Sequence, residues 1–336
     1  MPTNYALRTP LFAKAQSSDA NTASAECVIT VGGVTVYTIV KPAVQNVNVI
    51  FEVAELLRDY LFVGFTFYPQ KITFTTTIQF FDLPNAEGTA QGVPRNTISG
   101  DGYEAYTEFT DGANSIMPFG DRARPSWLLA PIHPNLPSTL NDDYYIYVPI
   151  GRGGTLCWID YVGNVSLDSY SGTDVTIQPA SGIPLNIVRI DCSKYGEGNQ
   201  VSFINKYGVM QDLWFSLKEV KSINRSNERF QSNTLDNNAT YPEVYAPIKL
   251  FNTQAKQSYS LSSGYYPEGA NQYFEQLLLS EYVWITRPRI NAPTLSETIP
   301  VTVKSSSFRY KTSLNDRLIE YTIEFEDAFD YINNIR

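Results

Sequence analysis

Histidine is nearly absent from this chain of 336 residues, because His133 is the only one and it lies in a proline-rich stretch. Histidine is the usual general base of enzymes and the commonest protein ligand of transition metals. The sequence also lacks the G-x-S-x-G elbow of hydrolases and the G-x-x-x-x-G-K-S/T phosphate loop. These absences weigh against catalysis, and we expect no catalytic residues, no cofactor and no metal site.

Cysteine is scarce too: Cys27, Cys157 and Cys192 are widely spaced, and no two form a C-x-x-C pair. This spacing predicts neither a disulfide framework nor a zinc site, so we expect reduced residues in a protein made in a cytoplasm. No apolar run approaches the roughly 18 residues of a membrane-spanning helix. The first 24 residues contain no apolar signal segment. We therefore expect neither membrane insertion nor a secretion signal.

Basic charge is in deficit as well, since 25 Lys and Arg stand against 34 Asp and Glu and give a net charge of −9. A surface that follows a phosphate backbone needs the opposite balance, so we expect no direct binding of nucleic acid. Basic residues between positions 218 and 229 are interleaved with Glu219 and Glu228. This pattern is typical of a solvated loop.

Aromatic residues, in contrast, are abundant, with 23 Tyr and 18 Phe. Tyrosine combines a large contact area and low rotamer entropy with a polar tip, which suits both β-strands and protein–protein interfaces. Composition leaves open whether these residues serve the core of a tyrosine-rich β protein or an interface. The candidate interface anchors are four bulky aromatic residues: Trp127, Trp214, Phe215 and Trp284.

Strands are predicted wherever apolar residues alternate with polar ones. Lys71–Phe81 shows the pattern with little ambiguity, with isoleucine and phenylalanine on one face and threonine and glutamine on the other. Cys27–Val31 and Val34–Val40 are β-branched runs joined by Gly32-Gly33, a connection that permits the positive φ angles of a tight hairpin. Residues 53–61 have the apolar spacing of a short helix.

The predicted fold class is mainly β, with tandem antiparallel sandwich-like or barrel-like domains and one or two short covering helices. We expect an N-terminal β-sandwich-like domain with a short helix at 1–125, a middle β-rich region at 126–199, and a C-terminal β domain at 200–336. The last contains one clear helix, at 270–280. Stretches rich in glycine, proline or polar residues predict three long loops, Leu83–Gly102, Pro118–Pro137 and Ser222–Pro247.

Near the C-terminus, Ile319, Tyr321, Ile323 and Phe325 alternate with polar residues and predict a half-buried closing strand. Tyr207-Gly208 predicts the turn of another hairpin. Three segments in this half have distinctive sequences: FINKYGVMQDLWF from position 203, LLLSEYVWI from position 277, and the tail from position 311 to 336. These segments resemble virion structural proteins of tailed bacteriophages of Bacteroidetes-type hosts, the crAss-like group and its relatives.

The resemblance covers roughly residues 185–336 and implies a tail, neck or baseplate component, a non-enzymatic protein that assembles. Its expected partners are other copies of itself, arranged in a ring, and neighbouring virion proteins. Its expected location is the virion, after synthesis in the cytoplasm of the bacterial host. The resemblance brings no catalytic residues to this chain.

Two other functions stay open. A receptor-binding or glycan-binding module of the virion would stack exposed Tyr and Trp side chains of the loops Leu83–Gly102 and Pro118–Pro137 on sugar faces. A carbohydrate-cleaving depolymerase would need only a pair of carboxylates. The available carboxylates belong to Asp142, Asp143, Glu324, Glu326 and Asp327. Acids on the solvated face of a strand or in a turn are usually structural, which disfavours the second alternative.

Overall fold

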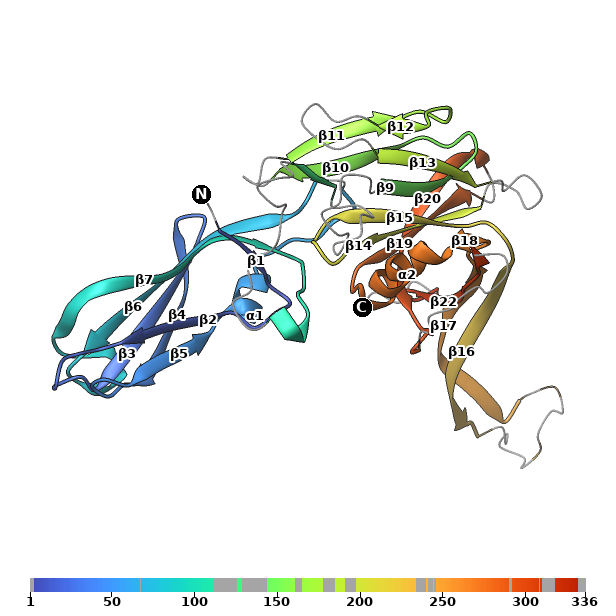
Figure 1. Cartoon of the computed structure of the whole chain (residues 1–336). Coiled ribbons are helices and arrows are strands. Elements are labelled where there is room, and N and C mark those ends of the chain that lie inside the picture. The colour runs from blue at the N-terminus through green and yellow to red at the C-terminus, as the bar shows by residue number, and fades with distance from the viewer. Residues whose placement is uncertain are drawn as a thin grey trace. The chain divides into compact units, whose positions relative to one another are not determined.

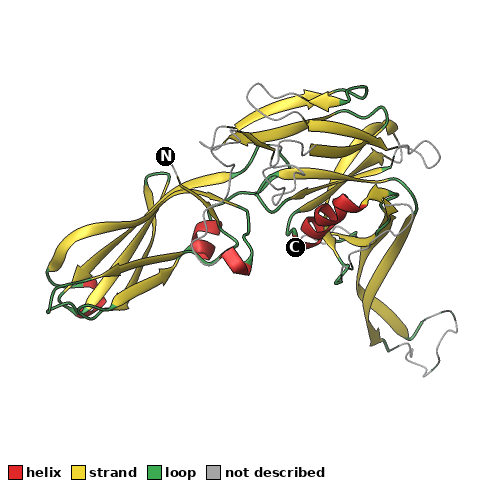
Figure 2. Cartoon of the chain, viewed as in Figure 1, coloured by secondary structure: helices red, strands yellow, loops and turns green. Residues whose placement is uncertain are grey.

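The computed structural model describes residues 3–66, 68–111, 126–128, 144–160, 165–177, 185–190, 198–233, 240, 244, 246–289, 292–307, 309 and 318–331. Strands dominate these residues, and two α-helices accompany them (Figures 1 and 2). Most strand pairs are antiparallel; β1 with β7 and β9 with β13 are parallel. The predicted mainly β fold class is confirmed.

The chain divides into two compact units, which we call unit 1 and unit 2. Unit 1 comprises Met1–Asp191 and Ser202–Asp212, and unit 2 comprises Cys192–Val201 and Leu213–Arg336. The chain thus passes from unit 1 to unit 2 and back before it completes unit 2.

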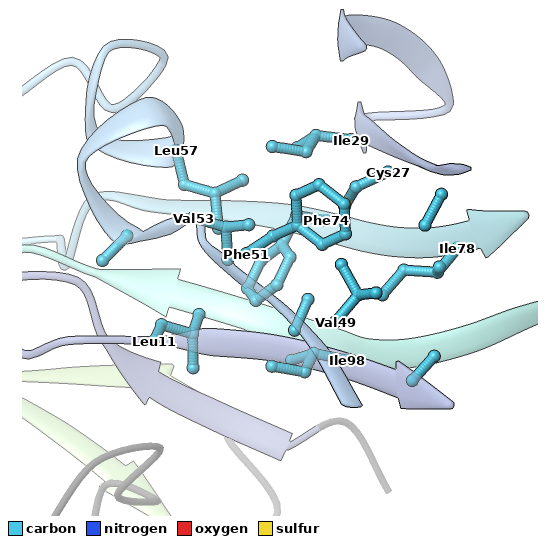
Figure 3. Close-up of a cluster of buried hydrophobic side chains, with 14 of the residues drawn as sticks. Leu11, Cys27, Ile29, Val49, Phe51, Val53, Leu57, Phe74, Ile78 and Ile98 are labelled. Atoms are coloured by element: carbon cyan, nitrogen blue, oxygen red, sulfur yellow. The ribbon is translucent and has the colours of Figure 1, made fainter. Parts of the chain in front are cut away.

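Unit 1 begins with a β-sandwich. Its elements are β1 (Thr3–Ala6), β2 (Phe12–Gln16), β3 (Ser24–Val31), β4 (Val34–Pro42), β5 (Asn48–Glu52), α1 (Ala54–Arg58), β6 (Lys71–Phe81), the 3-10 turn Pro84–Ala86 and β7 (Ala90–Tyr103). A five-stranded sheet runs in the order β1-β7-β6-β3-β4, and β2 pairs with β5 in a second sheet. Apolar side chains fill the space between the sheets: Figure 3 shows Val49 and Phe51 of β5 beside Phe74 and Ile78 of β6.

The strands of this sandwich follow from the sequence pattern. In β6, the four predicted inward residues, Ile72, Phe74, Ile78 and Phe80, are all buried. The hairpin of β3 and β4 turns at Gly32-Gly33, whose φ angles are +58° and +85°. Two positive φ angles in succession match the right-handed twist of the flanking strands. Both predictions are confirmed.

The predicted loop Leu83–Gly102 is wrong over most of its length, because β7 is a strand of 14 residues. It pairs with β6 along one edge and with β1 along the other. Two of the glycines that indicated a loop, Gly100 and Gly102, lie where β7 pairs with β1. A Cβ on Gly100 would clash with the carbonyl oxygen of Thr3, and one on Gly102 would lie 2.7 Å from the Leu7 side chain. Close approach of another backbone is a regular role of glycine in a strand.

The rest of unit 1 contains two three-stranded sheets. Its elements are the 3-10 turn Phe109–Asp111, β8 (Ser126–Leu128), β9 (Tyr144–Pro149), β10 (Gly154–Asp160), β11 (Val165–Tyr170), β12 (Thr176–Ile177) and β13 (Leu185–Ile190). The sheet orders are β11-β10-β8 and β12-β13-β9. The turn at Gly151 and Arg152 therefore joins strands of different sheets, whereas the glycine-rich sequence there suggests a hairpin turn.

Arg189 holds two turns of this region together. Its guanidinium donates hydrogen bonds to the carbonyl oxygens of Arg152 (2.6 Å), Ser171 (2.7 Å) and Asp174 (2.7 Å). A rigid fork of N–H donors suits several carbonyls at once, which a single ammonium could not reach.

Unit 2 is built around a seven-stranded sheet in the order β15-β14-β19-β20-β22-β17-β16. Its elements are β14 (Asn199–Ile204), β15 (Met210–Phe215), β16 (Glu219–Gln231), β17 (Ile248–Ser262), β18 (Tyr266–Pro267), the 3-10 turn Glu268–Ala270, α2 (Asn271–Leu279), β19 (Val283–Arg289), β20 (Ala292–Val303), β21 (Leu318–Ile319) and β22 (Thr322–Asp327). Residues 202–204 of β14 and 210–212 of β15 belong to unit 1. The predicted helix at 270–280 is confirmed by α2.

The core of unit 2 is aromatic. Phe274 of α2 contacts Phe215, Tyr266 and Tyr321, with ring centroids 6.2, 5.2 and 4.9 Å away. Phe325 of β22 packs edge to face on Phe215 at 5.7 Å. All four apolar residues of the predicted closing strand are buried, which confirms its inward face. The segment forms two strands instead of one: Ile319 lies in β21, which pairs with β18, and Ile323 and Phe325 lie in β22.

The two units differ from the three predicted regions, whose boundaries were at 125/126 and 199/200. The tip of the β14–β15 hairpin belongs to unit 1, where Tyr207 and Val209 pack with Tyr103 and Cys157. The Asn205 side-chain oxygen accepts the N–H groups of Tyr207 (3.0 Å) and Val209 (3.2 Å) and fixes this tip. A boundary read from loop composition misses such a contact, because the residues involved are distant in sequence.

Candidate interaction surfaces

Two of the four predicted anchors lie in the core of unit 2. Trp214 is 6% exposed and Phe215 is 2% exposed. The Tyr266 hydroxyl accepts the Trp214 N–H (3.0 Å) and donates to the Trp214 carbonyl (2.8 Å), so the backbone at this point is also tied inward. These side chains stabilise the fold of unit 2 and present no exposed surface.

The other two anchors have different places. Trp284 of β19 is half-buried and stacks on Tyr282 with ring centroids 6.4 Å apart. Trp127 lies in β8, and its side chain is outside the part of the chain that the structure describes. The structure therefore does not bring the four predicted anchors together in one surface.

The first exposed surface with unusual properties is a ribbon that we call the arm, formed by residues 223–231 of β16 and 248–257 of β17. The two strands pair from Ile223 with Gln257 to Gln231 with Ile248. The other edge of β17 pairs with β22 only from Ser258 onward, and at Ala255 its carbonyl accepts the N–H of Tyr331 (2.7 Å). Figure 1 shows β16 and β17 running out past β22 as a two-stranded ribbon.

The arm corrects another expectation, because Ser222–Pro247 was predicted to be a loop and β16 continues to Gln231. The expected solvation is present: nearly every residue of β16 is exposed. A strand that is solvated on both faces has no reason to alternate apolar and polar residues. The hydrophobic pattern of the sequence therefore does not predict this strand.

Five large apolar side chains of the arm are 45–59% exposed: Ile223, Phe230, Ile248, Leu250 and Phe251. Residues that face each other across an antiparallel pair share one face of the ribbon. Phe230 pairs with Lys249, and Phe251 pairs with Glu228, so both phenylalanines lie on one face of the ribbon. Leu250 pairs with Arg229 on the other face. The arm is thus apolar on both faces and cannot cover either face by itself.

The arm is also positively charged within an acidic protein. Along the sequence it carries Arg225, Arg229, Lys249 and Lys256 against the single acid Glu228, a balance of +3 where the whole chain has −9. Lys256, at the base of the arm, also lies 3.9 Å from the Glu326 carboxylate of β22. These cations are visible in the sequence, but the stretch that carries them has the composition of a solvated loop. The pairing of β16 with β17 leaves no pattern that would predict a strand.

The second surface lies in unit 1 and begins where α1 ends. We call residues 59–68 the aromatic loop, because Tyr60, Phe62, Phe65 and Tyr68 are all exposed, Phe62 by 80%. Phe67 is outside the described residues. Four exposed aromatic side chains within nine positions exceed what scattered surface residues give, and such groups mark binding sites. Sequence reasoning missed this loop, because it ended the predicted helix at Leu61 and assigned no role to residues 62–68.

The aromatic loop has acidic surroundings. Glu52, Glu55 and Asp59 are exposed at or beside its start. The cations nearby are engaged: Arg58 pairs with the buried Glu104 at 2.6 Å, and the Lys41 ammonium donates to the carbonyl oxygen of Ile50 at 2.8 Å.

Acidic charge is also concentrated in unit 1 as a whole. Along the sequence, unit 1 has 19 Asp and Glu against 11 Lys and Arg, and unit 2 has 15 against 14. Nearly all of the net charge therefore lies in unit 1.

At the entrance to the aromatic loop, the Tyr37 hydroxyl donates a hydrogen bond to the Asp59 carboxylate (3.0 Å), and this bond raises the pKa of Tyr37.

Of the two loops proposed for glycan stacking, the structure describes only Leu83–Gly102 along its whole length. Leu83–Gly102 contains neither Tyr nor Trp, and most of it is strand β7. Pro118–Pro137 lies outside the described residues except for Ser126–Leu128. Among the described residues of unit 1, four of the exposed aromatic side chains lie in the aromatic loop, and Phe109 is exposed elsewhere.

The carboxylates considered for catalysis have structural surroundings. Glu324 is exposed, and Glu326 accepts a hydrogen bond from Lys304 (2.8 Å), which lowers the pKa of Glu326. Asp327 is buried, and burial raises the pKa of its carboxyl. Asp142, Asp143 and His133 lie outside the described residues.

The two described cysteines are buried thiols. Burial raises the pKa of Cys27 to about 11 and of Cys157 to about 12, which keeps both thiols protonated and unreactive at neutral pH. Cys192 is outside the described residues. Within the part of the chain described here, no three His, Cys, Asp or Glu side chains gather closely enough to hold a metal ion.

Among the described residues, no helix has the length and apolar character needed to cross a membrane. Comparison with protein-family models, with curated proteins and with solved structures gives no match to this chain.

Proposed function

We propose that this chain is a non-enzymatic structural subunit of a tailed-phage particle, in the tail, neck or baseplate, and that it assembles through protein–protein contacts. The segments from positions 203, 277 and 311 support the phage assignment through their resemblance to virion proteins. The single observation that supports assembly is the arm, a basic ribbon with apolar side chains on both faces.

A ribbon of two strands is at best marginally stable in water when nothing packs on it. Burying a large apolar side chain completely stabilises by about 1.5–3 kcal/mol, so covering the exposed halves of five would contribute on the order of 5 kcal/mol. An exposed apolar strand pair is also an aggregation hazard unless a partner covers it. A subunit that is assembled in its working state fits these properties.

The test is the composition of purified particles. Particles are isolated on a density gradient, and an antibody against this chain is used for immunoblotting and for gold labelling in electron microscopy. We expect the chain in particles in fixed proportion to other virion proteins, with label confined to one level of the tail or neck. Particles that lack the chain would overturn the phage assignment.

The aromatic loop favours a second candidate, a receptor-binding or glycan-binding module, because exposed tyrosine and phenylalanine rings can stack on sugar faces. Calorimetry with polysaccharide from the host surface distinguishes the two functions. The glycan function predicts saturable binding that Phe62→Ala abolishes and Val93→Ser, at an equally exposed site on β7, leaves intact. The structural function predicts no such binding.

A further inference from the structure

We propose that the arm of one copy packs on the aromatic loop of a second copy of this chain. The inference rests on the proposed function, since it names the surfaces through which the subunit would assemble. It commits to a heterologous contact, in which two different surfaces meet, rather than to a symmetric one.

Charge is the first argument for this pair of surfaces. The arm has a balance of +3, and unit 1 has eight more acidic than basic residues. Three of its exposed acids, Glu52, Glu55 and Asp59, lie at or beside the start of the aromatic loop. Two arms that met each other would bring together like charges, and two aromatic loops would do the same with acids. Like-charge contacts disfavour a partner, and opposite potentials favour one. The heterologous contact is thus the one that electrostatics selects.

The apolar chemistry of the two surfaces agrees with this choice. One face of the arm offers the Phe230–Phe251 pair, and the aromatic loop offers Phe62 and Tyr68. Arginine and aromatic residues are the side chains most enriched in the centres of interfaces. Arg229 lies on the other face of the arm, where its guanidinium could stack on an aromatic ring while pairing with a carboxylate such as Glu55.

A geometric consequence comes from the use of two different surfaces. A heterologous contact leaves one arm and one aromatic loop unused in a dimer, so assembly continues until a ring closes or a filament forms. Where the rotation between neighbouring copies closes, this one contact forms a ring without any further interface.

The test uses the full chain, two double variants and one single control variant. The arm variant is Phe230→Ser with Phe251→Ser, the loop variant is Phe62→Ser with Tyr68→Ser, and the control is Val93→Ser. All these positions are exposed, and circular dichroism melting verifies folding. Size-exclusion chromatography with light scattering gives the mass of each variant alone and of the arm and loop variants mixed in equal amounts.

We expect the wild-type chain and the control to form multimers. Each double variant alone should be monomeric, with self-association weakened tenfold or more, on the order of what interface hot spots contribute. The mixture should form a dimer and nothing larger, because the loop variant retains an intact arm and the arm variant retains an intact loop. A mixture that stays monomeric, or an arm variant that still forms multimers, would overturn this contact.

The two proposals fail in distinguishable ways. If the chain is found in purified particles but the mixed variants do not recover a dimer, the docking contact is wrong and the structural function stands. If the chain is absent from particles, the proposed function fails whatever its self-association. A salt titration gives a second readout, since attraction between the basic arm and acidic unit 1 should weaken as ionic strength rises.

Discussion

The rings of Phe230 and Phe251 pack edge to face, with centroids 5.6 Å apart and an interplanar angle of 73°. Both residues are nearly half exposed, and they come from the two strands of the arm. An aromatic pair in this position contributes to the ribbon itself, and neither of its residues is buried. The pair should therefore contribute little to the stability of the isolated chain and more to self-association. Both contributions can be measured.

For the isolated chain, Phe230→Ser should lower the free energy of unfolding by about 0.5–1.5 kcal/mol, the usual contribution of an aromatic pair. Urea unfolding of dilute protein measures it. The same substitution should have a larger effect on self-association than on folding. A loss of several kcal/mol in the dilute chain would mean that Phe230 belongs to a core.

The closing strand gives the opposite expectation. Phe325 is fully buried and contacts Phe215, so Phe325→Ala should cost about 3–5 kcal/mol in the free energy of unfolding. Glu324→Gln, one position away on the exposed face, should be nearly neutral and serves as the matched control. Thermal melts of both variants decide the question. Small and equal effects would contradict the closing-strand assignment.

These contrasts show which parts of the fold the sequence could predict. The strands β6 and β22 have one buried face, so the alternation of Phe74 or Phe325 with polar neighbours is visible in the sequence. Strand β16 is solvated on both faces, and β7 uses Gly100 for close approach to β1. Neither feature leaves a periodic pattern: β16 has no buried face that requires one, and the close approach at Gly100 is caused by a strand that is distant in sequence.

The candidate surfaces were harder to predict for a related reason. Trp214 and Phe215 were expected to be anchors because they are bulky, but the same bulk places them in the core of unit 2. Phe62 is of the same residue type as the phenylalanines of the core, and its exposure depends on where α1 ends. Residue type alone cannot separate core aromatics from surface aromatics.

Arg189 should be important for the stability of unit 1. Arg189→Met removes the donors to three backbone carbonyls. It should lower the free energy of unfolding by about 1–3 kcal/mol, because the two partly buried acceptors, on Arg152 and Asp174, lose their partners. Arg189→Lys should recover only part of this loss, since one ammonium cannot reach all three oxygens. Chemical denaturation of the variants is the measurement. Equal stability of Arg189→Lys and wild type would contradict the role of the fork.

The buried Asp327 predicts a pH dependence. Because burial raises its folded-state pKa above the ordinary value of 3.8, its stabilising contribution is present in acid below that value. The contribution is lost as pH rises through the folded-state pKa. Asp327→Asn should therefore stabilise the chain at pH 7 relative to wild type, and this gain should shrink toward about pH 4.

The matched control for Asp327 is its neighbour Glu326, whose pKa is lowered by Lys304. Its contribution has the opposite sign: it is present above the ordinary pKa of the group and is lost as pH falls. Glu326→Gln should thus show a small loss at neutral pH that disappears in acid. Unfolding free energies at the two pH values test both variants. A loss of stability for Asp327→Asn at pH 7 would show that the charged carboxylate is needed.

The most direct test of the central claim is photo-crosslinking within assembled particles. A photoreactive phenylalanine analogue replaces Phe230 in the arm, particles are purified and irradiated, and the cross-linked peptides are identified by mass spectrometry. The assembly account predicts an adduct with the mass of two copies, with the cross-link falling within residues 59–68 of the second copy. A cross-link confined to a single chain, or one to a different surface of the second copy, would contradict it.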